Sequence, residues 1–478
     1  MSRVSDQTTP ESTEPKTESH DPAVPEAYSR FMRTGWGDRE LDLPRQAVAD
    51  RAAERRRRLA GLFPGERLVL PAGTYKPRAN DTDYRFRSDT AHTYLTGNQT
   101  SDAVLVLTDG EAVLYARPRS SRETDEFFRD RQYGELWAGR RPSARELSDS
   151  LGIEVRHVDR LADDLGRSAP PKTRVHRGVS THVDRLLAAD AGLDDDLARV
   201  VSEMRLVKDD WEIEQLQQAC DVTTLGFEDS VREWTQVLEY GERWIEGTFF
   251  RRARAMGNDI GYDSIVGGGS HATTLHWTEN SGAITPGDLV LLDMGVEGRQ
   301  LYTADVTRTL PVDGTFTGVQ RDLYDLVLAA QQAGIDAVRP GVPFADIHRA
   351  SMTVLAHGLE GMGLLPVPAT EALDPDNRTY ARWTLHGTSH MLGMDVHDCG
   401  RAAPEAYAKG DLAAGMVLTV EPGLYFQEDD LLVPEELRGI GIRIEDDVLV
   451  TDDGSRNLSA ALPRTSADVE EWMGRHLP

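Results

Sequence analysis

Two aspartates end strand-like segments of the sequence and could share a metal ion. Asp293 closes an apolar run that is typical of a buried strand, and Asp305 follows twelve residues later, after a turn-like stretch at 297–299. A hairpin would bring the two carboxylates together. Two close carboxylates need a proton or a cation between them. Ion pairs with Arg299 or Arg308 explain the same two residues equally well.

Three histidines, His386, His390 and His397, fall within a stretch of twelve residues. The glycine and threonine that follow His386 make a poor helix interior, and in an extended chain the period of two would place His386 and His390 on one side. The spacing differs from the HExxH zinc motif. A single histidine is most often a hydrogen-bonded structural residue, but three so close together favour a functional site.

Two further strand-like segments supply carboxylates. The apolar run 417–420 leads into Glu421 and a Pro-Gly turn. In the segment 439–445 strict alternation places three isoleucines on one face and Arg443 and Glu445 on the other. The isoleucine face needs a core, so the opposite face lines either solvent or a pocket.

Together these side chains could hold two divalent metal ions. Four carboxylates and one imidazole suffice for two ions about 3.5 to 4 Å apart with two bridging carboxylates. The five donors are Asp293, Asp305, His390, Glu421 and Glu445. Ligation rich in oxygen with one nitrogen favours Mn²⁺, Fe²⁺, Co²⁺ or Zn²⁺ over Ca²⁺. Two cations that share a water lower its pKa and produce hydroxide at neutral pH, which predicts metal-assisted hydrolysis.

The elements that must position these donors are expected in a C-terminal domain over residues 196–478. A long helix is predicted over 209–239, and two more over 318–338 and 345–359. Strands that end in polar residues recur between them, from 261 to about 450.

A smaller α/β domain is predicted over residues 26–195. Strand-like runs occur at 67–70, 103–107 and 112–115, and a helix is expected over 41–63. The basic run Arg55 to Arg58 in that helix is interpreted as a solvated face rather than an anion site, because acids neighbour it. Residues 1–25, with four prolines and no aromatic residue before position 26, are expected to be a disordered tail.

The charge and the cysteine content of the chain exclude several kinds of partner and site. The net charge of −27 over 478 residues argues against nucleic acid or an anionic membrane as a partner. The only cysteines, Cys220 and Cys399, cannot form a disulfide framework or a thiolate metal cage, and they suit a reducing cytoplasm. No stretch is typical of a secretory signal or a membrane-spanning helix. We therefore expect a cytoplasmic protein.

The segments that carry these donors resemble the pita-bread metallopeptidases of family M24, and within it the aminopeptidase P group. The likeness covers about residues 40 to 470, and its most specific segments are TADVTRTLPV, HGTSHMLGMDVHD, GMVLTVEPGLY and RGIGIRIEDD. It implies an α+β fold, with a pita-bread (creatinase/aminopeptidase) C-terminal domain and a smaller α/β creatinase-like N-terminal domain. It also implies an Xaa-Pro aminopeptidase that releases the N-terminal residue from peptides with proline second, by attack of a metal-bridging hydroxide. Manganese is the metal that the family commonly uses.

The resemblance assigns the five donors as metal ligands, with Asp305 and Glu445 bridging. It implies that His276 and His397 hold substrate carbonyls and the charge that develops in the reaction. Glu421 would carry a proton between the bridging water and the leaving prolyl nitrogen.

Other positions match the family around the proline. His386, His397 and Tyr425 would offer flat walls for the pyrrolidine ring, and Arg443 would pair with an acid and tether Tyr425. Trp137 either reaches a neighbouring subunit's site or belongs to the core of the N-terminal domain. A homo-oligomer, dimer or tetramer, is implied.

Three other functions share part of this residue pattern. A prolidase restricted to dipeptides would share all five ligands, and accepting longer peptides would favour the aminopeptidase. A metal-free pita-bread hydrolase or binding module would have lost ligand positions. A serine hydrolase is disfavoured because neither GGSHA nor GTSHM has the closing glycine of a nucleophile elbow. One departure from the family is Ala91, where an acid is usual, and it puts contacts between subunits in doubt.

Overall fold

The computed structural model describes residues 24–167 and 172–478, so positions 1–23 of the predicted tail lie outside the described residues. The chain divides into two compact units, and the division falls between Leu197 and Ala198. Among the described residues no helix combines the length and the apolar character needed to cross a membrane.

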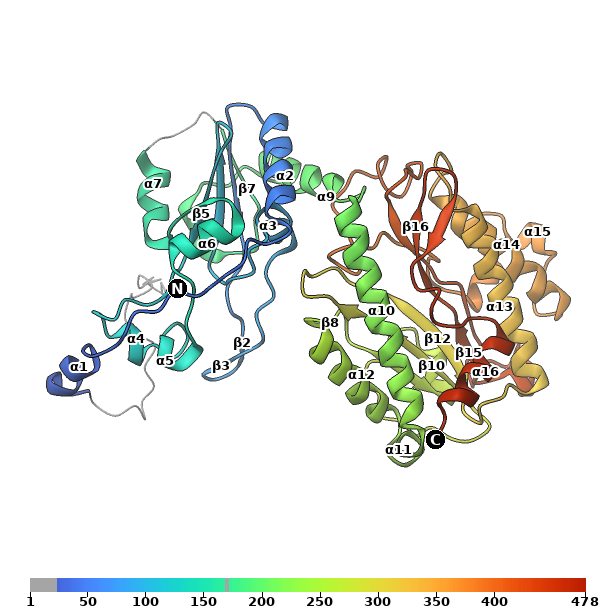
Figure 1. Ribbon diagram of the computed structural model, residues 1–478. Helices are drawn as coiled ribbons and strands as arrows, with labels where there is room; N and C mark the ends of the chain where they lie inside the picture. Colours follow the sequence, from blue (N-terminus) through green and yellow to red (C-terminus); the bar gives the residue numbers. More distant parts are fainter. Residues whose placement is uncertain (1–23, 168–171) are drawn as a thin grey trace, which may run out of the picture. The chain divides into compact units, whose positions relative to one another are not determined.

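The first unit is built on a five-stranded sheet of order β6-β5-β4-β1-β7. Strands β5 and β7 of this sheet are labelled in Figure 1. The strands are β1 (Arg67–Pro71), β4 (Val104–Thr108), β5 (Glu111–Ala116), β6 (Glu154–His157) and β7 (Thr173–Val175). β1 pairs antiparallel with β4 and parallel with β7. The strands predicted at 67–70, 103–107 and 112–115 are therefore confirmed. Helices of this unit include α2 (Ala49–Leu62), α3 (Thr90–Thr96), α6 (Ala144–Leu151) and α8 (Thr181–Leu186).

The basic run on α2 differs from its predicted solvated face. Arg55 and Arg56 are both buried. Arg56 Nη1 donates to Leu95 O at 2.8 Å, and Arg55 Nη1 donates to Tyr94 O at 3.2 Å. These carbonyls lie in the last turn of α3, where helical carbonyls lack a partner within the helix. The interpretation as a solvated face was wrong for these two residues, because the sequence does not reveal the helix end that they bind.

The second unit holds the strands that carry the predicted donors. One sheet has the order β12-β10-β9, another β13-β16-β17, and β14 pairs with β15. The bounds are β9 (Ile265–Gly268), β10 (Leu289–Met294), β12 (Val306–Pro311), β13 (Val417–Val420), β14 (Gly423–Tyr425), β15 (Gly441–Arg443), β16 (Asp446–Val450) and β17 (Ser455–Asn457). Two shorter strands, β8 (Asp259–Ile260) and β11 (Val296–Glu297), pair with each other.

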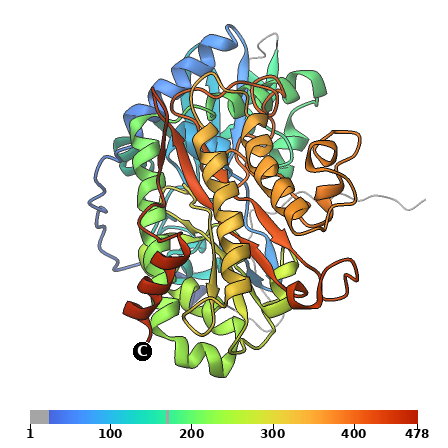
Figure 2. The ribbon, with the colours of Figure 1, turned by 90° about the vertical axis from the view of Figure 1, so that its right-hand side faces the viewer.

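Two pairs of helices flank these strands (Figure 1). α10 (Asp210–Arg232) runs beside α12 (Glu242–Met256), and α13 (Gly318–Ala337) runs beside α14 (Ala345–Gly361), a pair that faces the viewer in Figure 2. The predicted helices at 318–338 and 345–359 are confirmed. The one predicted over 209–239 is interrupted at Glu233 and continues as α11 (Trp234–Tyr240). Glu233 accepts hydrogen bonds from side chains of α12, contacts that the local pattern could not reveal.

The predicted hairpin and the predicted two-faced strand are both present. β10 pairs antiparallel with β12, with Asp293 opposite Thr307. Ile442 and Ile444 are buried in the main core of this unit. Arg443 and Glu445, on the opposite side, line a cavity. The face opposite the isoleucines therefore lines a pocket rather than solvent.

Candidate metal centre

A cavity of about 550 Å³ in the second unit gathers the predicted donors. All five candidate ligands line it, together with His276, His386, His397 and Arg443. They come from strand ends and loops that are far apart in the sequence. Of the predicted site residues in this unit, Tyr425 alone does not line the cavity; it is buried behind it.

Three of the donors are close enough to hold one ion. Ligand atoms of Asp305, His390 and Glu445 all lie within 4.8 Å of one another. His390 Nε2 is 3.3 Å from Asp305 Oδ2 and 3.5 Å from Glu421 Oε1. Its Nδ1 lies 3.3 Å from Met391 O, a contact that places a proton on Nδ1 and leaves Nε2 free for a metal.

Asp293 joins this group through a tyrosine. The Tyr262 hydroxyl is 2.7 Å from Asp293 Oδ1 and 2.5 Å from Asp305 Oδ1. A phenol has one proton to donate, so it cannot satisfy both carboxylates. The donor set, hard oxygens with one imidazole nitrogen, fits divalent cations.

Electrostatics also favour cation binding. Burial, reinforced by neighbouring carboxylates, raises the pKa of Glu421 to about 7 and the pKa of Glu445 well above its usual range. Burial likewise raises the pKa of Asp293, although Arg443 opposes the shift. Burial works against the charge of His390, but Asp305 and Glu421 outweigh it and raise its pKa to about 9. Without a cation, these acids hold protons that a metal would displace.

Arg443 links one carboxylate to the region behind the cavity. Its Nη2 donates to Asp293 Oδ2 at 2.6 Å, and its Nη1 donates to the Tyr425 hydroxyl at 2.9 Å. Arg308, one of the alternative partners of the aspartates, instead donates to Asp446 Oδ1 at 2.7 Å. Asp293 is thus the candidate ligand that pairs with an arginine, and the arginine is Arg443 rather than Arg308.

The hydrogen bonds of His386 continue this chain. His386 Nδ1 donates to Gly387 O at 2.8 Å, so Nε2 accepts from the Tyr425 hydroxyl, also at 2.8 Å. Burial and the Arg443 charge lower the pKa of His386 to about 3. The imidazole is therefore neutral. Tyr425 is buried and is absent from the cavity lining, so its ring does not form a wall of this cavity; its hydroxyl contacts His386 instead.

The two histidines expected to hold substrate differ in their surroundings. His397 packs edge-on against His390, with ring centroids 4.5 Å apart. Burial and the neighbouring His390 lower the pKa of His397. His276 is exposed at the wall of the cavity.

Trp137 belongs to the first unit. Its side chain is 55% exposed, which excludes the reading that it is core. Its Nε1 donates to Phe128 O at 2.8 Å, and Arg131 lies over its ring at 5.1 Å.

Two residues of the site were missed from the sequence. Tyr262 contacts two of the candidate ligands, Asp293 and Asp305, but no spacing rule links a tyrosine in a turn-like stretch to these acids. Thr307 Oγ1 donates to Glu445 Oε2 at 2.6 Å. The strand period of two, counted from Asp305, could have placed Thr307 on the ligand side.

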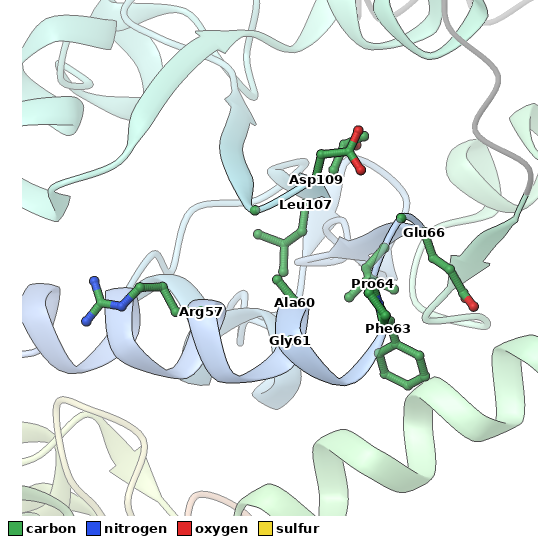
Figure 3. Close-up of a pocket in the computed structure, with 12 residues that line it drawn as sticks. Arg57, Ala60, Gly61, Phe63, Pro64, Glu66, Leu107 and Asp109 are labelled. Carbon is green, nitrogen blue, oxygen red and sulfur yellow. The ribbon is translucent and has the colours of Figure 1, made fainter.

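A second hollow, of about 410 Å³, lies in the first unit (Figure 3). The end of α2 and the turn after β4 form it, with Arg57, Glu66 and Asp109 as its charged lining residues. Glu66 is held by Arg174 at 2.5 Å. In the described part of the chain this hollow holds no histidine, cysteine or group of acids that could ligate a metal.

Comparison with known proteins gives matches over nearly the whole chain. The family model described as Metallopeptidase family M24 matches residues 214–452, and the one described as Aminopeptidase P, N-terminal domain, matches residues 52–176. The chain is 53% identical to Xaa-Pro aminopeptidase 1 of Streptomyces coelicolor, over 97% of this chain and 96% of that protein.

Solved structures agree with these matches. The structure of the Pseudomonas aeruginosa aminopeptidase PepP superimposes with a TM-score of 0.80 at 29% identity, over 91% of this chain and 99% of that one. A zinc-substituted Escherichia coli aminopeptidase P in complex with product gives a TM-score of 0.79 at 29% identity, over 91% of this chain and all of that one (100%).

Proposed function

The chain belongs to metallopeptidase family M24, and from this premise we propose that it hydrolyses the bond between an N-terminal residue and a proline in second position. It is a metallo-aminopeptidase with the predicted fold class, a pita-bread C-terminal domain and a smaller N-terminal domain. It uses divalent metal. The observation that carries the proposal is the single cavity that brings all five predicted donors together with three histidines.

We propose two ions, most naturally Mn²⁺, held by Asp293, Asp305, His390, Glu421 and Glu445. The proximity of Asp305, His390 and Glu445 supports one ion position, and Asp293, linked to Asp305 by Tyr262, supports the other. When bound, such a pair would supply Lewis acidity and would lower the pKa of a shared water, so that a hydroxide nucleophile is available at neutral pH.

Glu421 is proposed to move the proton. Its carboxylate lines the cavity beside the other proposed ligands, so it could take a proton from the attacking water and pass it to the leaving group. Its Oε2 lies 3.5 Å from His386 Nδ1, whereas Tyr425 contacts the other ring nitrogen, Nε2. The prolyl nitrogen, which must accept a proton as it leaves, would lie near Glu421 on the Nδ1 side of His386.

The histidines are proposed to bind the peptide. His276 would donate to a substrate carbonyl, and neutral His397 would stabilise charge that develops on the carbonyl oxygen. His386 and His397 would flank the pyrrolidine ring. A prolyl amide has no N–H and carries a ring, so it needs a dedicated pocket rather than a backbone donor contact.

The proposal also covers substrate length, cellular location and oligomeric state. The comparisons do not favour the alternative of a prolidase restricted to dipeptides. Two unpaired cysteines support a reducing, cytoplasmic location. We propose a homo-oligomer in which the exposed Trp137 reaches a neighbouring subunit's cavity.

Peptide-length profiling tests this function. The purified protein, with Mn²⁺, is offered Ala-Pro, Ala-Pro-Ala and longer Ala-Pro peptides, and matched peptides with alanine second. We expect release of the first residue from the tripeptide and longer prolyl peptides, and loss of activity after chelation. Cleavage of the dipeptide alone would support a prolidase, and equal cleavage of the alanine series would refute proline specificity.

A further inference from the structure

We propose that Glu242 is a positioning residue that fixes His276 at the wall of the cavity. It lies outside the metal ligands and outside the peptide-binding histidines. The inference rests on the proposed function, because it concerns the histidine that would hold a substrate carbonyl.

Glu242 begins α12, and its side chain is fully buried (0% exposed). Its carboxylate accepts four hydrogen bonds, two on each oxygen. Oε1 accepts from Gly268 N and His271 Nδ1, both at 2.8 Å. Oε2 accepts from Trp277 Nε1 at 2.9 Å and from Gly282 N at 2.6 Å. All four donors belong to one stretch, residues 268–282, which we call the His276 segment.

The two ends of the His276 segment are therefore joined by one side chain. Gly268 closes β9, and Gly282 lies fourteen residues further along the chain. The backbone adds to this closure, because Glu242 N donates to Gly282 O at 3.0 Å. The approach is so close that a Cβ on Gly282 would lie 2.5 Å from His271 Nδ1 and 2.8 Å from Glu242 Oε1.

His276 depends on this closure for its place. Its imidazole is exposed and makes no side-chain hydrogen bond among the described residues, so the backbone on either side of His276 decides where the ring lies. The next residue, Trp277, stacks on His271 with ring centroids 3.9 Å apart and planes at 27°. The same indole donates to Glu242. Glu242 thus acts on His276 through the adjacent Trp277 and through both ends of the segment.

The chemistry of the carboxylate is essential to this arrangement. A carboxylate offers only acceptors, and here every partner is a donor. The isosteric Glu242→Gln places an amide NH₂ against two of these donors, so at least one buried pair loses its hydrogen bond and meets a repelling group. The segment should then loosen while the volume of the side chain is unchanged.

Hydrogen–deuterium exchange and kinetics test this proposal together. In E242Q we expect peptides from 268–282 to exchange at least tenfold faster, and peptides from 386–397 to be unchanged. With Mn²⁺ and Ala-Pro-Ala, kcat/KM should fall roughly 10- to 100-fold, because a displaced His276 no longer donates to the substrate carbonyl. The matched control is Glu233→Gln, a carboxylate that accepts an indole N–H from Trp244 and a hydroxyl from Thr248, both on α12.

A double-mutant cycle separates positioning from general damage. If Glu242 acts through His276, E242Q in the His276→Ala background should cost less than about threefold further in kcat/KM. Additive losses, or unchanged exchange over 268–282, would overturn the proposal. If E242Q does not fold, Trp277→Phe removes only the indole donor, and the same two outcomes apply to it. Absence of prolyl cleavage by the wild type would refute the proposed function instead, and the exchange result would still decide the role of Glu242.

Discussion

The Tyr262 hydroxyl lies between Asp293 and Asp305, 2.7 Å from an oxygen of the first and 2.5 Å from an oxygen of the second. The hydroxyl thus contacts two carboxylates that are both proposed as metal ligands, and it can donate its single proton to only one of them at a time. Tyr262 is therefore placed to orient both ligands.

Replacing Tyr262 with Phe should weaken metal binding roughly 10- to 100-fold, because partners of metal ligands contribute about that much. Titration calorimetry of the chelated protein with Mn²⁺ measures the change. Tyr240→Phe is the control, since Tyr240 is exposed and stacks on Trp244. An unchanged affinity in Y262F would show that Tyr262 does not orient the ligands.

Replacing Glu421 with Gln should lower kcat on Ala-Pro-Ala by at least about 10³-fold, because the amide cannot carry a proton. Circular dichroism should show an unchanged fold. Glu428→Gln, at an exposed position seven residues further on, should keep full activity. Activity of E421Q within about tenfold of wild type would reject the role of Glu421 in proton transfer.

Chelation should destabilise the protein more at high pH than at low pH. Burial raises the pKa of Glu421 from an ordinary 4.5 to about 7, so its contribution to stability is complete below pH 4.5 and is lost as the pH rises through 7. The pKa of His390, raised to about 9, acts in the same direction. Its contribution to stability is complete below pH 6.5 and is lost as the pH rises through 9. The shift of Glu421 corresponds to about 3 kcal/mol.

Thermal melting with Mn²⁺ and with chelator, from pH 5.5 to 8, measures this effect. The difference in Tm between the two states should widen as the pH rises. A difference that stays constant or narrows would contradict the assignment of these acids to a cation site.

Asp430 should stabilise the second unit in a way that disappears in acid. Arg382 donates to both of its oxygens, at 2.8 and 2.9 Å, and Trp383 Nε1 donates at 3.0 Å. The hydrogen bond from Arg382 lowers the pKa of Asp430 to about 2, against the opposing effect of burial. This stability is present above pH 3.8 and is lost as the pH falls through 2.

Asp430→Asn should therefore lower the free energy of unfolding at pH 7 by about 1–2 kcal/mol. The expected loss is this small because Arg382 is half exposed and solvent screens its charge. Urea denaturation at pH 7 and pH 3 measures the loss, which should shrink at the lower pH. Asp429→Asn, its exposed neighbour, is the control. An equal loss at both pH values would show that the charge of Asp430 is not responsible.

Trp137 should be supplied in trans if subunits share cavities. Two inactive proteins, Trp137→Ala and Glu421→Gln, are mixed under conditions that exchange subunits. Recovery of about a quarter to a half of wild-type activity is expected when one cavity regains both residues. No recovery in hybrids verified by native mass spectrometry would refute a shared site.

The sequence was most informative where one local pattern predicted both a strand and the side of it that is buried. Alternation in 439–445 predicted that Arg443 and Glu445 lie opposite a buried isoleucine face, and the cavity lies there. The apolar run before Asp293 likewise predicted β10 and its hairpin. In both cases the residues that decide the outcome lie within a few positions of one another, so a short window suffices.

Contacts between segments that are far apart in the sequence could not be predicted from such a short window. The burial of Arg55 and Arg56 depends on the end of α3, and the place of Tyr262 depends on two strands that come later in the chain. Tyr425 was expected in the pocket wall from its place in a motif, but its partners Arg443 and His386 hold it behind that wall. A motif shows which residue is present and does not show which side of a neighbour it occupies.

The chain of contacts from Asp293 through Arg443 and Tyr425 to His386 has a practical consequence for protein engineering. A designer who enlarges the pocket at His386 to admit a different second residue also disturbs the support of a carboxylate at the far end of the same chain. Substrate preference and ion affinity should therefore change together in such variants. Libraries that vary His386 and Tyr425 jointly, with Arg443 retained, offer a better starting point than single substitutions.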